Sequence, residues 1–337
     1  MKKKLFALLS VVLIVVMACS LAACKPASMF DGNFKKEATA EEAKNMWDSA
    51  SASMSGDSTE TLATASDDDA AIKGWKGVKM SITSRSEMGG ESEDSKNNLI
   101  TDVSASGAYL FDGSAMAVTG VSEGTSVKGD KTESKKLNVG VYGKDKTTYT
   151  NIGFGDSALK VQATADLGLV GESINNMISS VSSQFVDTAV YTIGEIVCEM
   201  DYDKIVEMYN NTFKAYINDS GDYTRIKYVF TKEMIADLYA GASDEEDFLK
   251  MASLGECSII LVSDKATKTF QGAKLDINFT FENNTEDSKS WVKVNMSTSI
   301  ENCAEVDSSL PSDLDDYKDV KNLTIQEVME FFQSMNS

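Results

Sequence analysis

Two long runs near the C-terminus alternate apolar and polar residues, and this alternation constrains the fold more than any other feature. Every second residue of 275–281 is apolar, and residues 292–300 repeat the pattern except at Thr298. Successive side chains of a strand point to opposite faces of a sheet, so each run collects its apolar residues on one face. Such segments predict antiparallel strands with one face against a core and the other in water.

Further strand-like runs predict that the sheet is a long antiparallel meander. Turn signals such as Asp112-Gly113 and Lys128-Gly129-Asp130 separate them. The expected strands are 78–83, 99–111, 115–121, 137–142, 147–154, 158–164, 190–200, 224–230, 257–262, 272–282 and 291–306. Three polar stretches, 55–71, 84–98 and 122–136, are expected as loops.

Helices are expected at the start of the folded region and as insertions between strands. Thr39-Ala40-Glu41-Glu42 is a capping box, which predicts a helix start. The apolar stripe that follows at helical spacing consists of Ala43, Met46, Trp47, Ala50 and Met54. Other helices are expected near 170–185, 205–216, 232–241, 244–253 and after Thr324. The sequence therefore predicts an α+β fold whose helices cover an apolar sheet face.

The N-terminus has the three parts of an export signal. Lys2-Lys3-Lys4 precede an apolar run from Leu5 to Ala18, and Leu21-Ala22-Ala23-Cys24 follows. This ending resembles the lipobox of bacterial lipoproteins. The resemblance implies cleavage before Cys24 and a diacylglyceryl thioether on its sulfur. An uncleaved membrane anchor is the alternative, because the apolar region approaches the ~20 residues that span a bilayer.

The lipoprotein interpretation divides the chain into three parts. Residues 1–23 are the signal peptide, 24–38 a lipidated tether and 39–337 a single α+β domain. A division into two domains near residue 200 is the runner-up. The protein is then expected on the outer face of a cell membrane, held there by its lipid, in a bacterium that is expected to be Gram-positive.

Composition excludes several kinds of chemistry. The 337 residues include 52 Asp and Glu, 32 Lys and Arg and 0 His, with a net charge of −20. Without His there is no Ser-His-Asp or Cys-His pair and no His-ligated zinc. The negative charge disfavours nucleic acid as a partner. We expect no catalytic residue, no metal site and no cofactor beyond the lipid on Cys24.

The order of elements resembles the lipoprotein-carrier superfamily (LolA/LppX/LprG-like). It combines a lipobox, a capped N-terminal helix, a one-sided antiparallel sheet and inserted helices. More narrowly, the chain is similar to uncharacterised Gram-positive surface lipoproteins, above all over 222–311 with Tyr223-Thr224-Arg225-Ile226 at its start. The resemblance implies a sheet curved into a half-barrel, helices across its concave side and an acyl chain between them.

Three functions are compatible with these features. The first is non-enzymatic binding or carriage of an apolar ligand such as a lipid, between sheet and helices. Its candidate pocket residues are Met46, Trp47, Met177, Met208, Phe213, Ile277, Phe279, Val294 and Met296, although an ordinary filled core uses the same stripes. The second is an interaction or scaffold module whose polar loops bind a cell-envelope protein or a cell-wall polymer. The third, a hydrolase using paired carboxylates, has no distinctive pair to support it.

Overall fold

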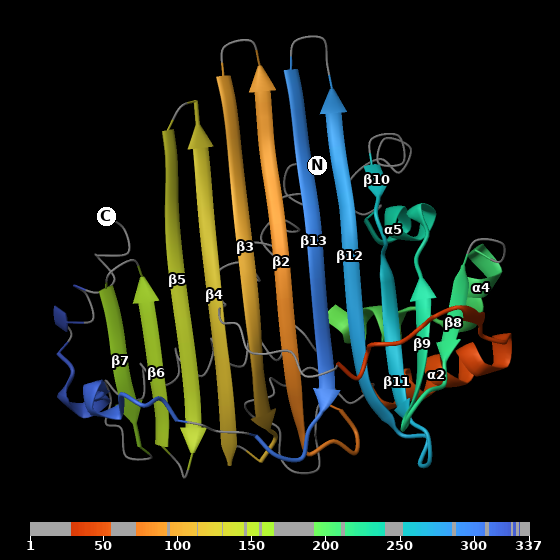
Figure 1. The fold of residues 1–337 in the computed structure, drawn as a ribbon, viewed down its shortest axis with the longest axis horizontal. Coiled ribbons are helices and arrows are strands. Elements are labelled where there is room, and N and C mark those ends of the chain that lie inside the picture. The colour runs from red at the N-terminus through yellow and green to blue at the C-terminus, as the bar shows by residue number, and fades with distance from the viewer. Residues whose placement is uncertain are drawn as a thin grey trace.

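A computed structural model shows how the chain folds (Figure 1). It describes residues 28–54, 72–92, 95–112, 114–129, 131–144, 147–154, 157–164, 192–209, 213–239, 252–284, 288–306, 310–324, 326–327 and 330. Its helices are α2 (Ala40–Met54), η1 (Glu195–Glu199), α4 (Tyr202–Tyr209), α5 (Lys232–Tyr239), η2 (Leu314–Asp316) and η3 (Val320–Asn322).

Fourteen strands of the described chain form one curved, open sheet. They are β1 (Lys36–Glu37), β2 (Gly77–Ser92), β3 (Ser95–Leu110), β4 (Ala115–Lys128), β5 (Lys131–Lys144), β6 (Thr147–Phe154), β7 (Ser157–Ala163), β8 (Lys214–Asn218), β9 (Tyr223–Val229), β10 (Ala252–Leu254), β11 (Ser258–Asp264), β12 (Phe270–Asn284), β13 (Ser288–Asn302) and β14 (Lys318–Asp319). Their order is β1-β8-β9-β11-β12-β13-β2-β3-β4-β5-β6-β7-β14, with β10 beside β12. The pairs are antiparallel except β14 with β7. The predicted curved antiparallel sheet is confirmed, and its open form is consistent with a half-barrel.

The register between strands gives the sheet two different faces. Ile82 lies opposite Thr298 and Ala105, while Ile259 lies opposite Tyr228 and Leu275. These rows form the inner face, which carries the main hydrophobic core. Rows shifted by one residue form the outer face, which is mostly polar. The two-residue period of the strands therefore separates a core from a solvated surface.

Helix α2 packs on the inner face at the β9–β11 end of the sheet. The Tyr228 hydroxyl on β9 donates a hydrogen bond of 2.7 Å to the Ala43 carbonyl oxygen on α2. The predicted apolar stripe is the buried stripe of the helix: Ala43, Met46, Trp47, Ala50 and Met54. The predicted capping box is also present, because Thr39 N–H donates to Glu42 Oε2 (2.8 Å) and Glu42 N–H donates to Thr39 Oγ1 (3.2 Å).

Loss of this capping box is expected to destabilise the protein in a pH-dependent way. Thr39→Ala removes one of the two bonds and should lower the free energy of unfolding by about 1 kcal/mol at pH 7. The Thr39 N–H is the main cause that lowers the pKa of Glu42 below its usual value of 4.5. A carboxyl whose pKa is lowered in the folded state stabilises that state at pH values above its usual pKa. This stabilisation is lost as the pH falls through the lowered pKa. Thr39→Ala keeps this backbone N–H, so urea titrations should show a similar loss for it at pH 7 and pH 3. Glu42→Gln removes the carboxylate that the N–H stabilises, so its loss should be present at pH 7 and smaller at pH 3.

Two predicted loops are wrong. Residues 84–98 and 122–136 belong almost entirely to the long hairpins β2–β3 and β4–β5. Both faces of these stretches carry many Ser, Thr and charged residues, so the apolar alternation that identifies a strand is missing. Continuous backbone pairing with neighbouring strands holds them in the sheet. The third expected loop, 55–71, lies outside the described residues.

Two other elements differ from the sequence-based expectation. The strand expected at 190–200 is helical from 192 to 199, because Ile193 and Val197 are buried four residues apart next to α2. The helix expected at 205–216 is present as α4 as far as Tyr209, but residues 214–216 belong to β8, whose backbone pairs with β9. Within 244–253, residues 252–253 belong to β10, and the rest lie outside the described residues, as does the helix expected at 170–185.

Candidate functional site

The layer between α2 and the sheet is tightly packed. Trp47 is 1% exposed, and its Nε1–H donates a 3.0 Å hydrogen bond to the Met200 carbonyl oxygen. Its ring meets Tyr228 edge-on at 5.0 Å and Tyr202 at 6.2 Å between centroids. Phe213 stacks on Tyr228 at 6.0 Å. Candidate pocket residues Trp47 and Phe213 are thus brought into one aromatic cluster, where they fill a core.

The other candidate pocket residues are dispersed. Met46 is buried on α2, whereas Met208 on α4 is 64% exposed. Two cross-strand pairs on the inner face bring together Ile277 with Met296 and Phe279 with Val294. Val294 is buried, and the other three are partly buried. Met177 lies outside the described residues. A common pocket for all nine residues stays a prediction.

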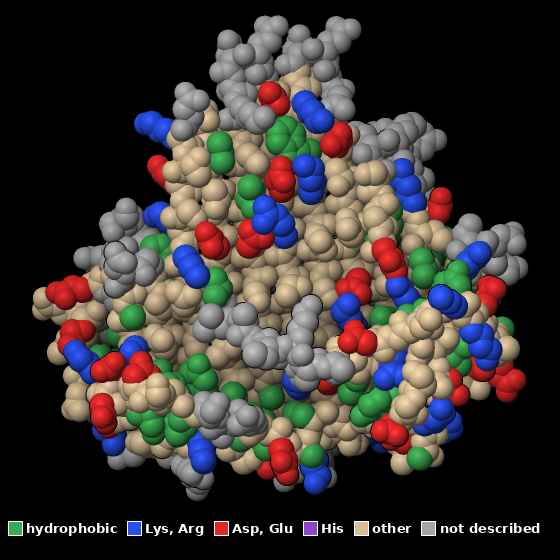
Figure 2. All heavy atoms as spheres, viewed as in Figure 1, with side chains coloured by type: hydrophobic (Ala, Val, Ile, Leu, Met, Phe, Trp, Pro, Cys, Tyr) green, Lys and Arg blue, Asp and Glu red, His purple; other side chains and the backbone are tan. Residues whose placement is uncertain are grey.

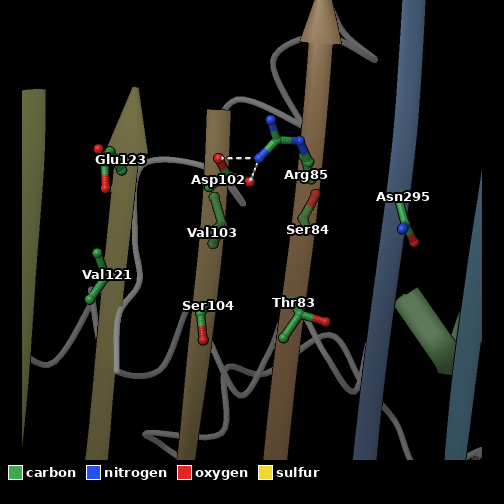
Figure 3. Close-up of a pocket in the computed structure, with 9 residues that line it drawn as sticks. All are labelled: Thr83, Ser84, Arg85, Asp102, Val103, Ser104, Val121, Glu123 and Asn295. Carbon is green, nitrogen blue, oxygen red and sulfur yellow. Dashed lines mark hydrogen bonds and ion pairs between the residues drawn. The ribbon is translucent and has the colours of Figure 1, made fainter. Parts of the chain in front are cut away.

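A hollow of about 330 Å³ lies over the central strands β4, β3, β2 and β13 (Figure 3). Its lining residues are Thr83, Ser84, Arg85, Asp102, Val103, Ser104, Val121, Glu123 and Asn295. Seven of them point to the outer face, while Ser84 and Val103 belong to inner-face rows. We call this hollow the outer groove. Figure 2 shows this face, on which acidic and basic side chains lie side by side over the central strands.

An ion pair stands at the centre of the outer groove. Arg85 Nη1 donates to both oxygens of Asp102, at 2.8 and 2.7 Å. The register places Arg85 opposite Asp102 on one side and opposite Asn295 on the other. Asp102 in turn lies opposite Glu123, and like charges at such positions repel. The Arg85 charge therefore offsets a repulsion that the β3–β4 register creates.

Hydroxyl groups and a second charge cluster surround the ion pair. Ser134 Oγ donates to Glu123 Oε1 at 3.0 Å, and Thr83 and Ser104 line the groove. Further along the same face, Trp291 Nε1–H donates to Glu87 Oε1 at 3.0 Å. Burial acts to raise the pKa of Glu87, but the bonds from Trp291 and Lys293 outweigh it and lower the pKa. The bonds from Trp291 and Lys293 thus favour the ionised form of the Glu87 carboxyl.

The outer groove was not predicted from the sequence. Arg85 and Glu123 lie in stretches expected as loops, and Asn295 comes from a strand far away in the chain. A usable signal was present, because Arg85 is one of only two arginines and arginine favours planar carboxylate pairing.

Metal ligands, thiols and membrane-spanning helices were also sought in the described part of the chain. Within it, no group of three or more Cys, Asp or Glu is arranged to hold a metal ion. Cys198, Cys257 and Cys303 form no disulfide with one another. No helix among the described residues is both long and apolar enough to cross a membrane. Cys24 lies outside the described residues.

Comparisons with known proteins give little further information. No protein-family model matches the chain, and no curated protein matches it. Among solved structures, a DUF1329 family protein from Desulfovibrio piger is similar over 72% of this chain and 90% of its own, with 11% identity and a TM-score of 0.14. At that TM-score the match does not define the fold or the function of this chain.

Proposed function

We propose that the protein is a non-enzymatic binding protein of the cell envelope, anchored through a lipid on Cys24, whose outer groove binds a hydroxyl-rich polymer such as a wall glycan. The observation that supports this function is the groove over β2–β4, where an arginine, two carboxylates and several hydroxyl groups surround one hollow. The lipobox supports the anchor and the location on the outer face of the membrane.

The chemistry of the lining favours a polar and nearly uncharged ligand. Arg85 and Asn295 supply N–H donors, while Asp102 and Glu123 supply acceptors. Arg85 and Asp102 neutralise one another, and Lys136 lies opposite Glu123, so the groove attracts neither strong anions nor strong cations. A sugar presents hydroxyl groups that donate and accept at once, and it matches such a lining. Small-molecule pockets are lined mainly by apolar groups, and protein interfaces have an apolar centre, whereas only Val121 adds an apolar side chain on this face.

The direction of the polar row favours an extended ligand. Asn295, Arg85, Asp102, Glu123 and Lys136 lie in one cross-strand row on β13, β2, β3, β4 and β5. Adjacent strands are ~4.8 Å apart, so the row extends for about 20 Å across the sheet. A linear polymer can follow such a row and exchange hydrogen bonds with each strand in turn.

Binding of an acyl chain is less well supported by the described residues. The α2–sheet layer is occupied by the aromatic cluster around Trp47 and Tyr228. Carriage of a lipid stays a prediction for the inner face further from α2, because the helix expected at 170–185 lies outside the described residues.

Substitution of Arg85 tests the proposed function. Arg85→Ala removes the central donor and leaves Asp102 opposite Glu123, so affinity for a glycan should fall about tenfold or more. Binding of solubilised peptidoglycan glycan strands and of dextran would be measured by calorimetry with residues 25–337. Lys79→Ala is the matched control, because Lys79 is an exposed cation on the same strand and face, paired with Glu301 at 4.0 Å.

Three results would separate the alternatives. Glycan binding that Arg85→Ala weakens and Lys79→Ala preserves would support the proposal. Equal binding by both variants would exclude the outer groove as the site. Binding of phosphatidylglycerol or fatty acid in native mass spectrometry, without glycan binding, would favour the lipid carrier instead.

A further inference from the structure

Residues 28–38, predicted from the sequence to belong to the tether, are docked on the sheet, and we call them the docked segment. Phe30 is 4% exposed and packs with Ile260 and Val262 on the outer face of β11. Next to it, the Met29 carbonyl oxygen accepts a 2.5 Å hydrogen bond from Arg225 Nε. The docked residues thus cover the outer face of β11, whose inner face carries the main core.

Polar contacts hold the segment along its whole length. Arg225 is 8% exposed, and its Nη1 also donates to the Ser220 and Tyr223 carbonyl oxygens at 2.9 and 3.3 Å. Asn218 Nδ2 donates to the Asn33 carbonyl oxygen at 3.1 Å. β1 then pairs with β8, and Ala38 N–H donates to the Ala215 carbonyl oxygen at 2.9 Å. The attachment is therefore continuous from Met29 to α2.

This docking leaves a very short connection to the lipid. Only residues 25–27 lie between the lipidated Cys24 and Ser28, so the two ends are at most about 14 Å apart. A tether that was free as far as Ala40 would extend to about 55 Å. When the contacts of Phe30 and Arg225 are formed, the domain is held close to the bilayer. If they were broken, the domain would be free to move away from it.

The docked segment begins at one end of the long strands. Met29 lies over Gly272 near the start of β12, since a Cβ on Gly272 would come within 2.9 Å of Met29 Sδ. The tip of the β4–β5 hairpin lies at the other end of the strands. Residue pairing from β4 across β3, β2 and β13 to β12 places Lys128 in the same cross-strand row as Asn283. Asn283 lies eleven positions after Gly272 along β12, which corresponds to about 37 Å. In Figure 1 the hairpin tips point upward, away from the lower end of β11 and β12.

We propose that the docked segment holds the β8–β9 and β11–β12 turns against the outer leaflet and directs the long hairpins, with the outer groove, away from the membrane. This inference rests on the lipid anchor of the proposed function and not on the glycan ligand. The surface that the β8–β9 and β11–β12 turns contact is that of the lipid bilayer. The groove lies about 20 Å further along the strands, at the level of Asn278, and faces the space beyond the membrane.

Energy transfer to labelled lipids tests this orientation in the lipidated full chain. Cys198, Cys257 and Cys303 are replaced by Ser or Ala, and one donor dye is attached at Ala266→Cys in the β11–β12 turn or at Lys128→Cys at the hairpin tip. The protein is reconstituted in vesicles of phosphatidylglycerol and phosphatidylethanolamine with an acceptor on the headgroups. Transfer from position 266 should exceed transfer from position 128 several-fold. Insertion of 20 Gly and Ser residues after Ala27 should remove most of this difference, because such a linker spans about 25 Å on average.

The outcomes are distinct. Equal transfer from both positions in a protein whose mass shows the lipid on Cys24 would mean that the sheet lies flat or moves freely, and it would overturn the orientation alone. A difference that survives the insertion would also overturn the role of the short connection. An unmodified Cys24 in the mass spectrum would overturn the anchor, and the orientation with it.

Discussion

Replacement of Trp47 by Ala is expected to lower the free energy of unfolding by about 4 kcal/mol. Fully buried aromatic side chains lose about 3–5 kcal/mol when truncated to Ala, because apolar contacts are lost and a cavity remains. Trp47 is 1% exposed and contacts Tyr202 and Tyr228. Its removal also leaves the Met200 carbonyl oxygen without the indole donor, which adds a desolvation cost.

Urea unfolding followed by far-ultraviolet circular dichroism would measure this effect. Met208→Ala is the control, since Met208 is also an apolar residue of the helical region but is 64% exposed, and it should change stability by less than about 0.5 kcal/mol. A loss below about 1 kcal/mol for Trp47→Ala would show that the layer between α2 and the sheet is loosely filled. That result would restore the lipid-carrier interpretation, so the experiment bears on function as well as on stability.

The sequence predicted elements whose signal is local. The α2 stripe and its capping box follow from spacings of three and four residues, and both are present in the structure. Strands β12 and β13 were predicted from their two-residue alternation. The upper parts of β2–β3 and β4–β5 were missed because their strand pairing depends on neighbouring strands rather than on an apolar pattern.

The outer groove depends on contacts between residues distant in the sequence. Arg85 meets Asp102 across a hairpin, but Asn295 joins them only because β13 pairs with β2. No spacing within one segment contains that information. The docking of Phe30 is similar, because its partners Ile260 and Val262 lie on β11. An exposed tether has no need of aromatic residues such as Phe30 and Phe34, and their presence was the available signal.

Phe30→Ala is expected to release the docked segment while the sheet remains folded. The substitution removes the buried ring from a small cluster with Ile260 and Val262, which should cost about 3 kcal/mol. The segment lies at the edge of the main core, so this energy should appear as local opening. Amide hydrogens of the segment that bond to the sheet, such as that of Ala38, should then exchange about a hundredfold faster, whereas those of β11 that bond to β12 should change little.

Phe34→Ala provides a matched comparison for Phe30→Ala. Phe34 is an aromatic residue of the same segment, but it is only partly buried and lies 5.8 Å from Lys227 Nζ. Phe34→Ala should therefore accelerate the amide hydrogen exchange of the docked segment much less than Phe30→Ala does. If both variants accelerate exchange equally, docking is spread along the backbone contacts of Arg225 and Asn218 and does not depend on the buried ring. If Phe30→Ala accelerates exchange throughout β11 as well, the segment is part of the global folding unit, and its release cannot occur without unfolding the sheet. Only selective opening makes Phe30 the residue that sets the length of the connection between the proposed lipid anchor and the domain.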